Sequence, residues 1–460
     1  MYINKVFYTL VLVLMTLVCS PHLVEGAKDF GIRGLKFRMA KLETACQMVK
    51  DADIKWYRGD ITWKSLVDEE GNFNWGTLDK QTKKILRHKI RIIYTLRSVH
   101  ELFAPGSGKV DLGYKTVWRS APPAPEYVVS YEDFVRQVVE RYDGDGLSDA
   151  PFVNETKNIK YWQIENEPGK KPDKGSNFWN GTASDYADLY LVAYDIIKEA
   201  NPEAKVALSG FGYGGIEYSV EHGTSFPLEV LRILDERGGD FDVFDLHFYQ
   251  DYSRFSADEA LHPVLSTYPQ FKNKPIWVTE TNVDKAELDP DYTTEEYNRF
   301  VAKDIVKRYA VLFAGKVRKV FWSRLADRRN SSWNVPENYW CFTGLTEHND
   351  ANLTPKPVYY TYALLIRKTK GKKPIVRIES QAYEWVYRFG KDDNAVYIMW
   401  YDSPLDESKE VLIPLSWEEV LITRVISEPG VTEPETEIRP TVDGALGITL
   451  DNSPIFVEKH

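Results

Sequence analysis

Two glutamates could carry chemistry, because each stands at the end of a short apolar run that has the pattern of a β-strand. Glu167 lies in Tyr-Trp-Gln-Ile-Glu-Asn-Glu-Pro at 161–168, and Glu280 lies in Pro-Ile-Trp-Val-Thr-Glu-Thr-Asn at 275–282. Cleavage of a glycosidic bond needs a proton donor for the leaving oxygen and a carboxylate across the sugar. A single glutamate at a strand end is more often a solvated or salt-bridged residue. The chemistry therefore depends on a fold that brings both together.

The elements around these glutamates form a repeating pattern. Short β-branched and aromatic runs recur, each followed by a helical pattern, which is typical of βα units around a parallel sheet. Eight units favour a closed (β/α)8 TIM barrel, and a doubly wound open sheet is the alternative, although no Gly-rich phosphate motif follows the first run. The expected strands are 29–34, 54–60, 90–96, 159–165, 204–209, 241–249, 275–280 and 317–323, and the expected helices are 41–52, 77–88, 131–142, 183–200, 227–237 and 294–313.

The segments outside the βα repeat predict a cleft wall and a second domain. The link after the third strand, 98–130, contains four prolines and is too long for a plain turn, so we expect it to wall a cleft. From about residue 372 the pattern changes to alternating strands without helices, which indicates a small β-sandwich; these strands are expected at 376–379, 383–389, 395–401, 411–414, 420–426 and 455–457. We therefore place a catalytic barrel at 27–370 and the sandwich at 371–460.

The N-terminus is typical of an export signal. One lysine at position 5 precedes a 14-residue apolar run at 6–19, shorter than the roughly 20 residues that cross a bilayer. We expect a signal peptide at 1–26 and a secreted or periplasmic protein without a membrane anchor after cleavage. The two cysteines that remain, Cys46 and Cys341, could form a single bridge or stay as two buried thiols.

The composition narrows the class of partner. The chain has 58 Lys and Arg against 68 Asp and Glu, a net charge of −10, and no basic run, which argues against a nucleic-acid or anionic-membrane partner. It is rich in aromatic residues, with 13 Trp, 28 Tyr and 21 Phe, whose flat rings suit the faces of sugars. No sequence pattern defines an oligomeric state.

Asn-Glu-Pro after the fourth strand together with Thr-Glu after the seventh resembles glycoside hydrolase clan A, the retaining (β/α)8 glycosidases, over most of residues 29–370. A barrel followed by a sandwich, with the 161–168 segment, is most similar to family 39 or a relative. The resemblance implies that Glu167 is the acid/base and Glu280 the nucleophile. It also implies that Asn166 bonds the sugar 2-hydroxyl.

Three further positions match this clan. Arg58, at the end of the second strand, resembles the arginine that keeps the nucleophile ionised, and a structural ion pair with Asp60 is the alternative. His247 and Tyr249 share one face of the sixth strand by alternation. The resemblance implies that Tyr249 bonds the nucleophile and that His247 lines the substrate site, whereas a core histidine is the plainer alternative.

Aromatic residues supply candidates for stacking on sugar. The resemblance makes Trp322, on the eighth strand, the floor of the sugar site. Trp118, Trp333, Tyr339 and Trp340 are further candidates, but ordinary packing is the favoured interpretation of each.

A third acid, Glu165, departs from the clan's pattern and could be mistaken for the acid/base. We prefer Glu167, because the following proline is expected to fix its backbone in an extended conformation at the strand end.

The sequence therefore predicts a retaining glycoside hydrolase that acts on a β-linked oligo- or polysaccharide, with its two carboxyl groups about 5 to 5.5 Å apart. No metal or organic cofactor is expected, since the eight histidines include no His-Glu-x-x-His or Cys/His cluster. A non-catalytic carbohydrate-binding barrel and a transglycosylase with the same site are the alternatives.

Overall fold

A computed structural model describes residues 29–35, 37, 39–112, 116–284, 288–289, 291–328, 341–347, 352–378 and 381–460. The predicted signal peptide lies outside these residues, as do three of the stacking candidates, Trp333, Tyr339 and Trp340. Over the described part of the chain, every helix is too short or too polar to cross a bilayer.

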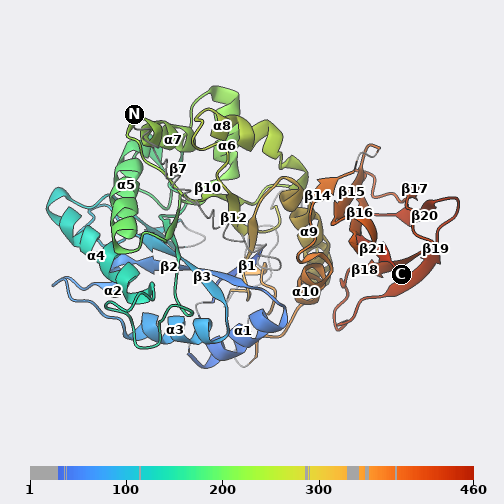
Figure 1. Ribbon diagram of the computed structural model, residues 1–460, viewed down its shortest axis with the longest axis horizontal. Helices are drawn as coiled ribbons and strands as arrows, with labels where there is room; N and C mark the ends of the chain where they lie inside the picture. The colour runs from blue at the N-terminus through green and yellow to red at the C-terminus, as the bar shows by residue number, and fades with distance from the viewer. Residues whose placement is uncertain are drawn as a thin grey trace, which may run out of the picture.

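Parallel strands form the closed barrel that the sequence predicts (Figure 1). The strands in order are β1 (Phe30–Arg33), β2 (Trp56–Thr62), β3 (Arg91–Arg97), β6 (Tyr161–Ile164), β9 (Lys205–Ala207), β10 (Phe211–Gly212), β11 (Phe244–Phe248), β12 (Ile276–Thr281) and β13 (Lys319–Ser323). The sheet runs β10-β11-β12-β13-β1-β2-β3-β6-β9. β9 and β10 are successive parts of the fifth barrel strand, and a parallel bridge from Ala207 to Val243 joins the two ends of the sheet. The doubly wound alternative is therefore wrong.

Helices cover the outside of the strands (Figure 1). Two of them begin with a capping box, in which Thr182 pairs with Asp185 and Thr293 pairs with Glu296, so both termini have satisfied N–H groups. The helices are α1 (Met39–Asp51), α2 (Trp63–Leu66), α3 (Gly76–Arg87), α4 (Val128–Tyr142), α5 (Ala183–Ala200), α6 (Tyr213–His222), α7 (Phe226–Glu236), α8 (His262–Ser266), α9 (Thr294–Ala314) and α10 (Pro357–Thr369).

Apolar residues fill the amino-terminal half of the barrel interior. Trp56, Trp277 and Phe321 pack there with Ile93, Ala207 and Val243. A side chain at Gly31 would collide with the ring of Phe321, so the glycine leaves room for Phe321 in this apolar layer. The inward-facing polar residues are consequently confined to the carboxyl ends of the strands, where they lie above a dry layer.

The C-terminal strands form the expected β-sandwich. Its larger sheet runs β14 (Ile375–Arg377), β15 (Glu384–Phe389), β16 (Val396–Tyr401), β21 (Ile455–Lys459), β18 (Glu419–Arg424) and β19 (Thr436–Pro440), and its smaller sheet pairs β17 (Lys409–Pro414) with β20 (Ala445–Leu450). The sequence analysis missed β19 and β20. β19 is a polar edge strand and β20 contains Gly447, so neither has the apolar run that the other strands show.

The sandwich packs against α9 and α10 of the barrel (Figure 1). Lys307 of α9 donates to the carboxylate of Asp402 over 2.8 Å, and the indole N–H of Trp400 donates to the hydroxyl of Tyr252 over 3.2 Å. Thr361 of α10 donates to the carbonyl of Ile426 over 2.6 Å. These buried polar contacts fix the sandwich on the side of the barrel.

Both cysteines are buried free thiols, so the single bridge is ruled out. Cys46 lies on the inner face of α1, and burial raises the pKa of its thiol to about 12, which leaves it unreactive at neutral pH.

Candidate active site

Glu280 lies at the carboxyl end of β12 and is held by three side chains. Arg33 and Arg58 each place Nη1 2.6 Å from Oε1 of Glu280, and the hydroxyl of Tyr249 donates to Oε2 over 2.7 Å. Arg33 and Arg58 are register partners on β1 and β2, so both project to the same side of the sheet. The side chain of Glu280 is only 4% exposed.

The charges around Glu280 keep it ionised. Burial alone would raise the pKa of this carboxyl, but Arg33, His247 and Arg58, with the hydrogen bond from Tyr249, lower it well below its usual 4.5. Glu280 is therefore a carboxylate at neutral pH.

A buried network fixes the orientation of Arg58. Its Nε donates to Gln163 over 2.7 Å and its Nη2 donates to Asn166 over 2.9 Å. Gln163 also accepts from the hydroxyl of Thr95 and donates to the carboxylate of Asp245. Asp245 in turn accepts the backbone N–H of residue 279 over 3.0 Å. Each polar group has a partner, so the guanidinium is held in one position.

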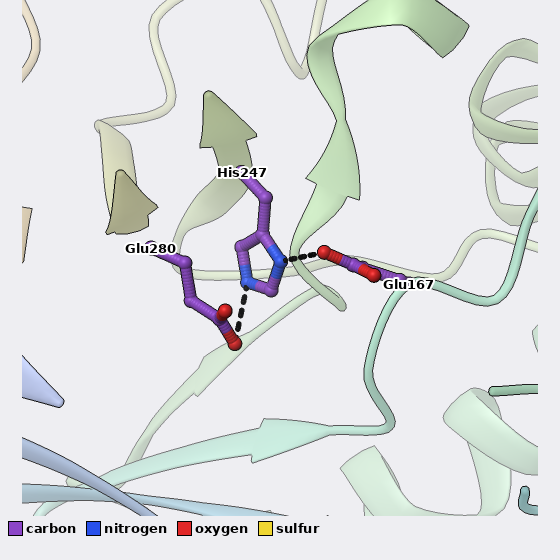
Figure 2. A group of neighbouring side chains, drawn as sticks. All are labelled: Glu167, His247 and Glu280. Carbon is purple, nitrogen blue, oxygen red and sulfur yellow. Dashed lines mark hydrogen bonds and ion pairs between the residues drawn. The ribbon is translucent and has the colours of Figure 1, made fainter. Parts of the chain in front are cut away.

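His247 joins the two glutamates (Figure 2). Its Nδ1 is 2.6 Å from Oε1 of Glu167, and its Nε2 is 3.6 Å from Oε1 of Glu280. One carboxylate oxygen of each glutamate lies within 4.8 Å of the other. A side chain at Gly210 would collide with the imidazole, so this position of His247 needs a glycine on the neighbouring strand.

The two glutamates differ in environment. The side chain of Glu167 is 27% exposed, whereas that of Glu280 is almost fully buried. The carboxyl of Glu167 is therefore open to water, while that of Glu280 is enclosed among cations.

The same three residues could share a metal ion, since one atom from each lies within 4.8 Å of the others. The charges of Arg33 and Arg58 on Glu280 oppose a cation there, however. This donor set therefore suits ion pairing better than metal binding.

The pre-proline argument for Glu167 is wrong. Glu167 has φ +45°, in the left-handed region, instead of an extended backbone. Glu165 has φ +65° and also leaves the strand conformation. Its buried carboxylate accepts the backbone N–H of Ser98 over 2.5 Å and lies 3.7 Å from Arg97, away from Glu280. The left-handed backbone at Glu165 and Glu167, and not the proline, therefore directs their two carboxyl groups to different places. Each left-handed residue costs backbone strain of order 1 kcal/mol.

Trp322 does not form the floor of a sugar site. Its register partner on β1 is Ile32, and both side chains face the outer helices, whereas Phe321 and Ser323 face the barrel interior. The indole is fully buried and its N–H donates to the carbonyl of Thr343 over 2.9 Å. No face of this ring is open to a ligand.

The segment 98–130 forms a hairpin of β4 (Gly108–Asp111) and β5 (Thr116–Arg119). Trp118 lies on it, 37% exposed, with the ammonium of Lys109 over its ring. The hairpin is tied to the loop after β6, because Ser120 donates its N–H to the carbonyl of Phe178 over 2.8 Å. None of its described residues lines the cavity beside Glu280, whereas Pro122, Pro123 and Val128 line a separate, smaller cavity of about 180 Å³.

That cavity has a volume of about 450 Å³ and lies at the ends of β1, β2 and β13. Its charged lining consists of Arg33, Arg58, Asp60, Arg324, Asp327 and Arg328. Cations thus predominate in it, in contrast to the net charge of −10 of the whole chain.

The sequence analysis brought Glu167, Glu280, Asn166, Arg58, His247 and Tyr249 to this site, and the structure places all six together. It missed Arg33, Gln163 and Asp245. Alternation along the first strand and along 161–165 would have placed Arg33 and Gln163 on inner faces, but no residue-type pattern connects them with Glu280.

No family model and no curated protein matches the chain. Solved structures do match. A family 39 glycoside hydrolase from Bacteroides cellulosilyticus WH2 superposes with a TM-score of 0.66 at 16% identity, over 94% of this chain and 81% of that one. A monomeric β-xylosidase from Caulobacter crescentus CB15 gives 0.60 at 14% identity, over 94% and 95%. A glucosidase from Croceicoccus marinus gives 0.61 at 12% identity, over 94% and 96%. At these identities the likeness establishes a common fold.

Proposed function

We propose that this protein is a retaining glycoside hydrolase that cleaves β-linked oligo- or polysaccharides by double displacement. The observation that carries the proposal is the pair Glu167 and Glu280, whose nearest oxygens lie within 4.8 Å at the mouth of the barrel. This spacing suits the 5 to 5.5 Å separation of carboxyl groups in retaining enzymes and leaves too little room for the water that an inverting enzyme places between them. The fold shared with glycosidases agrees with it.

In the first step the carboxylate of Glu280 attacks the anomeric carbon, and Glu167 gives its proton to the leaving oxygen as the glycosidic bond breaks. Arg33, Arg58 and Tyr249 keep Glu280 ionised and aimed. Asn166 is turned toward this site by Arg58, in a position that suits a contact with a sugar hydroxyl.

In the second step Glu167 removes a proton from water, the water oxygen attacks the same carbon, and Glu280 leaves as a carboxylate. The partial exposure of Glu167 gives the water access to its base. His247 is placed to hold the Glu167 carboxylate in one orientation through both steps.

The predicted signal peptide supports the further proposal that the enzyme acts outside the cytoplasm on polysaccharide fragments.

The test is hydrolysis of aryl β-glycosides, with xylosides and glucosides included, by the protein without its first 26 residues. Glu280→Gln should lose turnover, since the amide cannot form the glycosyl-enzyme. Arg136→Gln, which breaks only a surface ion pair with Glu199, is the matched control. Proton NMR of the first product should show the β-anomer; an α-anomer would contradict retention. A protein that binds sugar equally well with and without Glu280 and never turns it over would be a binding module.

A further inference from the structure

Among the described residues that line the cavity beside Glu280, arginines outnumber carboxylates. Asp60 accepts from Arg33 over 3.3 Å, and Asp327 is paired with Lys356 over 3.2 Å through both oxygens. Glu280 is already shared by two arginines. The acids in and around the cavity are therefore committed to other cations.

Among the described residues, Arg324 has no carboxylate partner of this kind. Within the described part of the chain, its guanidinium makes no hydrogen bond or ion pair, although it follows β13 directly and lines the cavity. Burial, together with the charges of Arg328 and Arg33, lowers the pKa of Arg324 to about 10. Neighbouring guanidinium groups that are partly buried repel each other. An anion that binds between them relieves this repulsion and is held by both charges.

The position of the cavity determines which part of a substrate would reach it. Its walls include Arg33 and Arg58, which contact Glu280, but not His247, which contacts Glu167. On the proposed function, the leaving group lies beside Glu167 because that residue protonates it. The sugar attacked by Glu280 therefore lies on the side of the cavity.

We propose that this cavity binds an anionic group on the sugar that Glu280 attacks, either the carboxylate of a uronic acid or a sulfate ester, with Arg324 as a specificity-determining residue. Both groups present oxygens that match the planar fork of a guanidinium. This inference rests on the proposed function and adds the substrate class to it. Arg328 supplies a second cation to the same space.

The experiment compares kcat/KM for 4-nitrophenyl β-glucoside with those for the β-glucuronide and the 6-sulfo-β-glucoside, which differ only at carbon 6. We expect at least one anionic substrate to exceed the neutral one roughly tenfold or more. Arg324→Gln should lower the anionic rate by roughly 10- to 100-fold, the range for one lost hydrogen bond to a charged group, and change the neutral rate less than about twofold. Arg324→Lys should restore part of the lost kcat/KM for the anionic substrate, because lysine keeps the positive charge but not the planar guanidinium.

Salt dependence and a control variant far from the cavity test whether the preference for anionic substrates is electrostatic. The advantage of the anionic substrate should shrink as ionic strength rises, because screening weakens the attraction. Arg136→Gln removes one arginine on α4 and should leave the ratio of the two substrates unchanged. The thermal midpoint of each variant shows whether a loss comes from unfolding.

The outcomes separate the two proposals. A preference for the uronide or for the sulfated sugar supports the inference and identifies the group. Turnover of the neutral sugar at least as fast, with Arg324→Gln affecting all substrates alike, overturns the inference while the glycosidase stands. If no substrate is turned over, the proposed function fails, and calorimetric titration with free glucuronate and glucose then tests the anion site alone. Tighter binding of glucuronate that Arg324→Gln abolishes supports the anion site. Equal binding of the two sugars, or no binding, overturns it.

Discussion

Replacing Tyr249 by Phe removes one oxygen from the site and little else. The hydroxyl donates to Oε2 of Glu280 over 2.7 Å, and the residue directly follows β11, so the ring can stay in place. This bond stabilises the ionised carboxylate. In the proposed mechanism it loses strength when Glu280 becomes the uncharged ester of the glycosyl-enzyme, and it is regained as the ester breaks. We therefore expect the variant to slow the second step more than the first.

The size of the effect follows from the strength of such a bond. A hydrogen bond to a charged group contributes about 1.5–3 kcal/mol. If half of this is regained in the transition state of the second step, the loss of about 0.75–1.5 kcal/mol slows that step about 4- to 13-fold, at 1.36 kcal/mol per tenfold. Loss of the whole bond in the free enzyme raises the pKa of Glu280, since the Tyr249 bond lowers it. The acidic limb of kcat/KM should move to higher pH by about one to two pH units.

Stopped-flow kinetics with an aryl glycoside that has a good leaving group test this reasoning. The variant should show a burst of released phenol, with kcat and KM both reduced, because the glycosyl-enzyme accumulates. Tyr190→Phe, whose hydroxyl bonds to the carbonyl of Asp240 on the outside of the barrel, is the control. A raised KM at constant kcat, with an unmoved acidic limb, would refute the argument and place the hydroxyl on the substrate.

Four other changes test single features of the site. Glu167→Gln should lower kcat/KM by about 10²- to 10⁴-fold for substrates with poor leaving groups and much less for dinitrophenyl glycosides, as a steady-state comparison would show. Glu165→Gln should change kcat/KM less than about threefold in the same assay, because its carboxylate lies away from the site. Arg33→Gln should raise the pKa of Glu280 and shift the acidic limb of kcat/KM to higher pH, measured from about pH 2 upward. Trp322→Phe should lower the free energy of unfolding by about 1–3 kcal/mol in urea titration without raising KM. A raised KM would instead indicate that Trp322 stacks on the sugar.

The strands and the two glutamates could be predicted because each depends on a short stretch of chain. Runs of β-branched and aromatic residues indicate the strands, and in a barrel every strand delivers its last residues to one mouth. Glu167 and Glu280 therefore meet although 113 positions separate them in the sequence.

Side-chain directions at the strand ends could not be predicted in the same way. Strict alternation would put Glu165 on the same face as Gln163, but the left-handed backbone at Glu165 turns its carboxylate to Ser98. Trp322 fails for a related reason, since the register with β1 decides which face of β13 is inward. A single residue of register or one unusual φ reverses such a prediction.

By itself, the sequence determined the barrel, the sandwich and the pair of acids, because local periodicity and the common direction of parallel strands are sufficient for them. Only the tertiary structure decided the charge of the site. Arg33 and Arg58 lie on the neighbouring strands β1 and β2, Arg324 directly follows their neighbour β13, and nearly 300 positions separate the first arginine from the last. The electrostatic field of the site depends on distances of a few ångströms between such residues, and these distances cannot be obtained from the spacing of the residues along the chain.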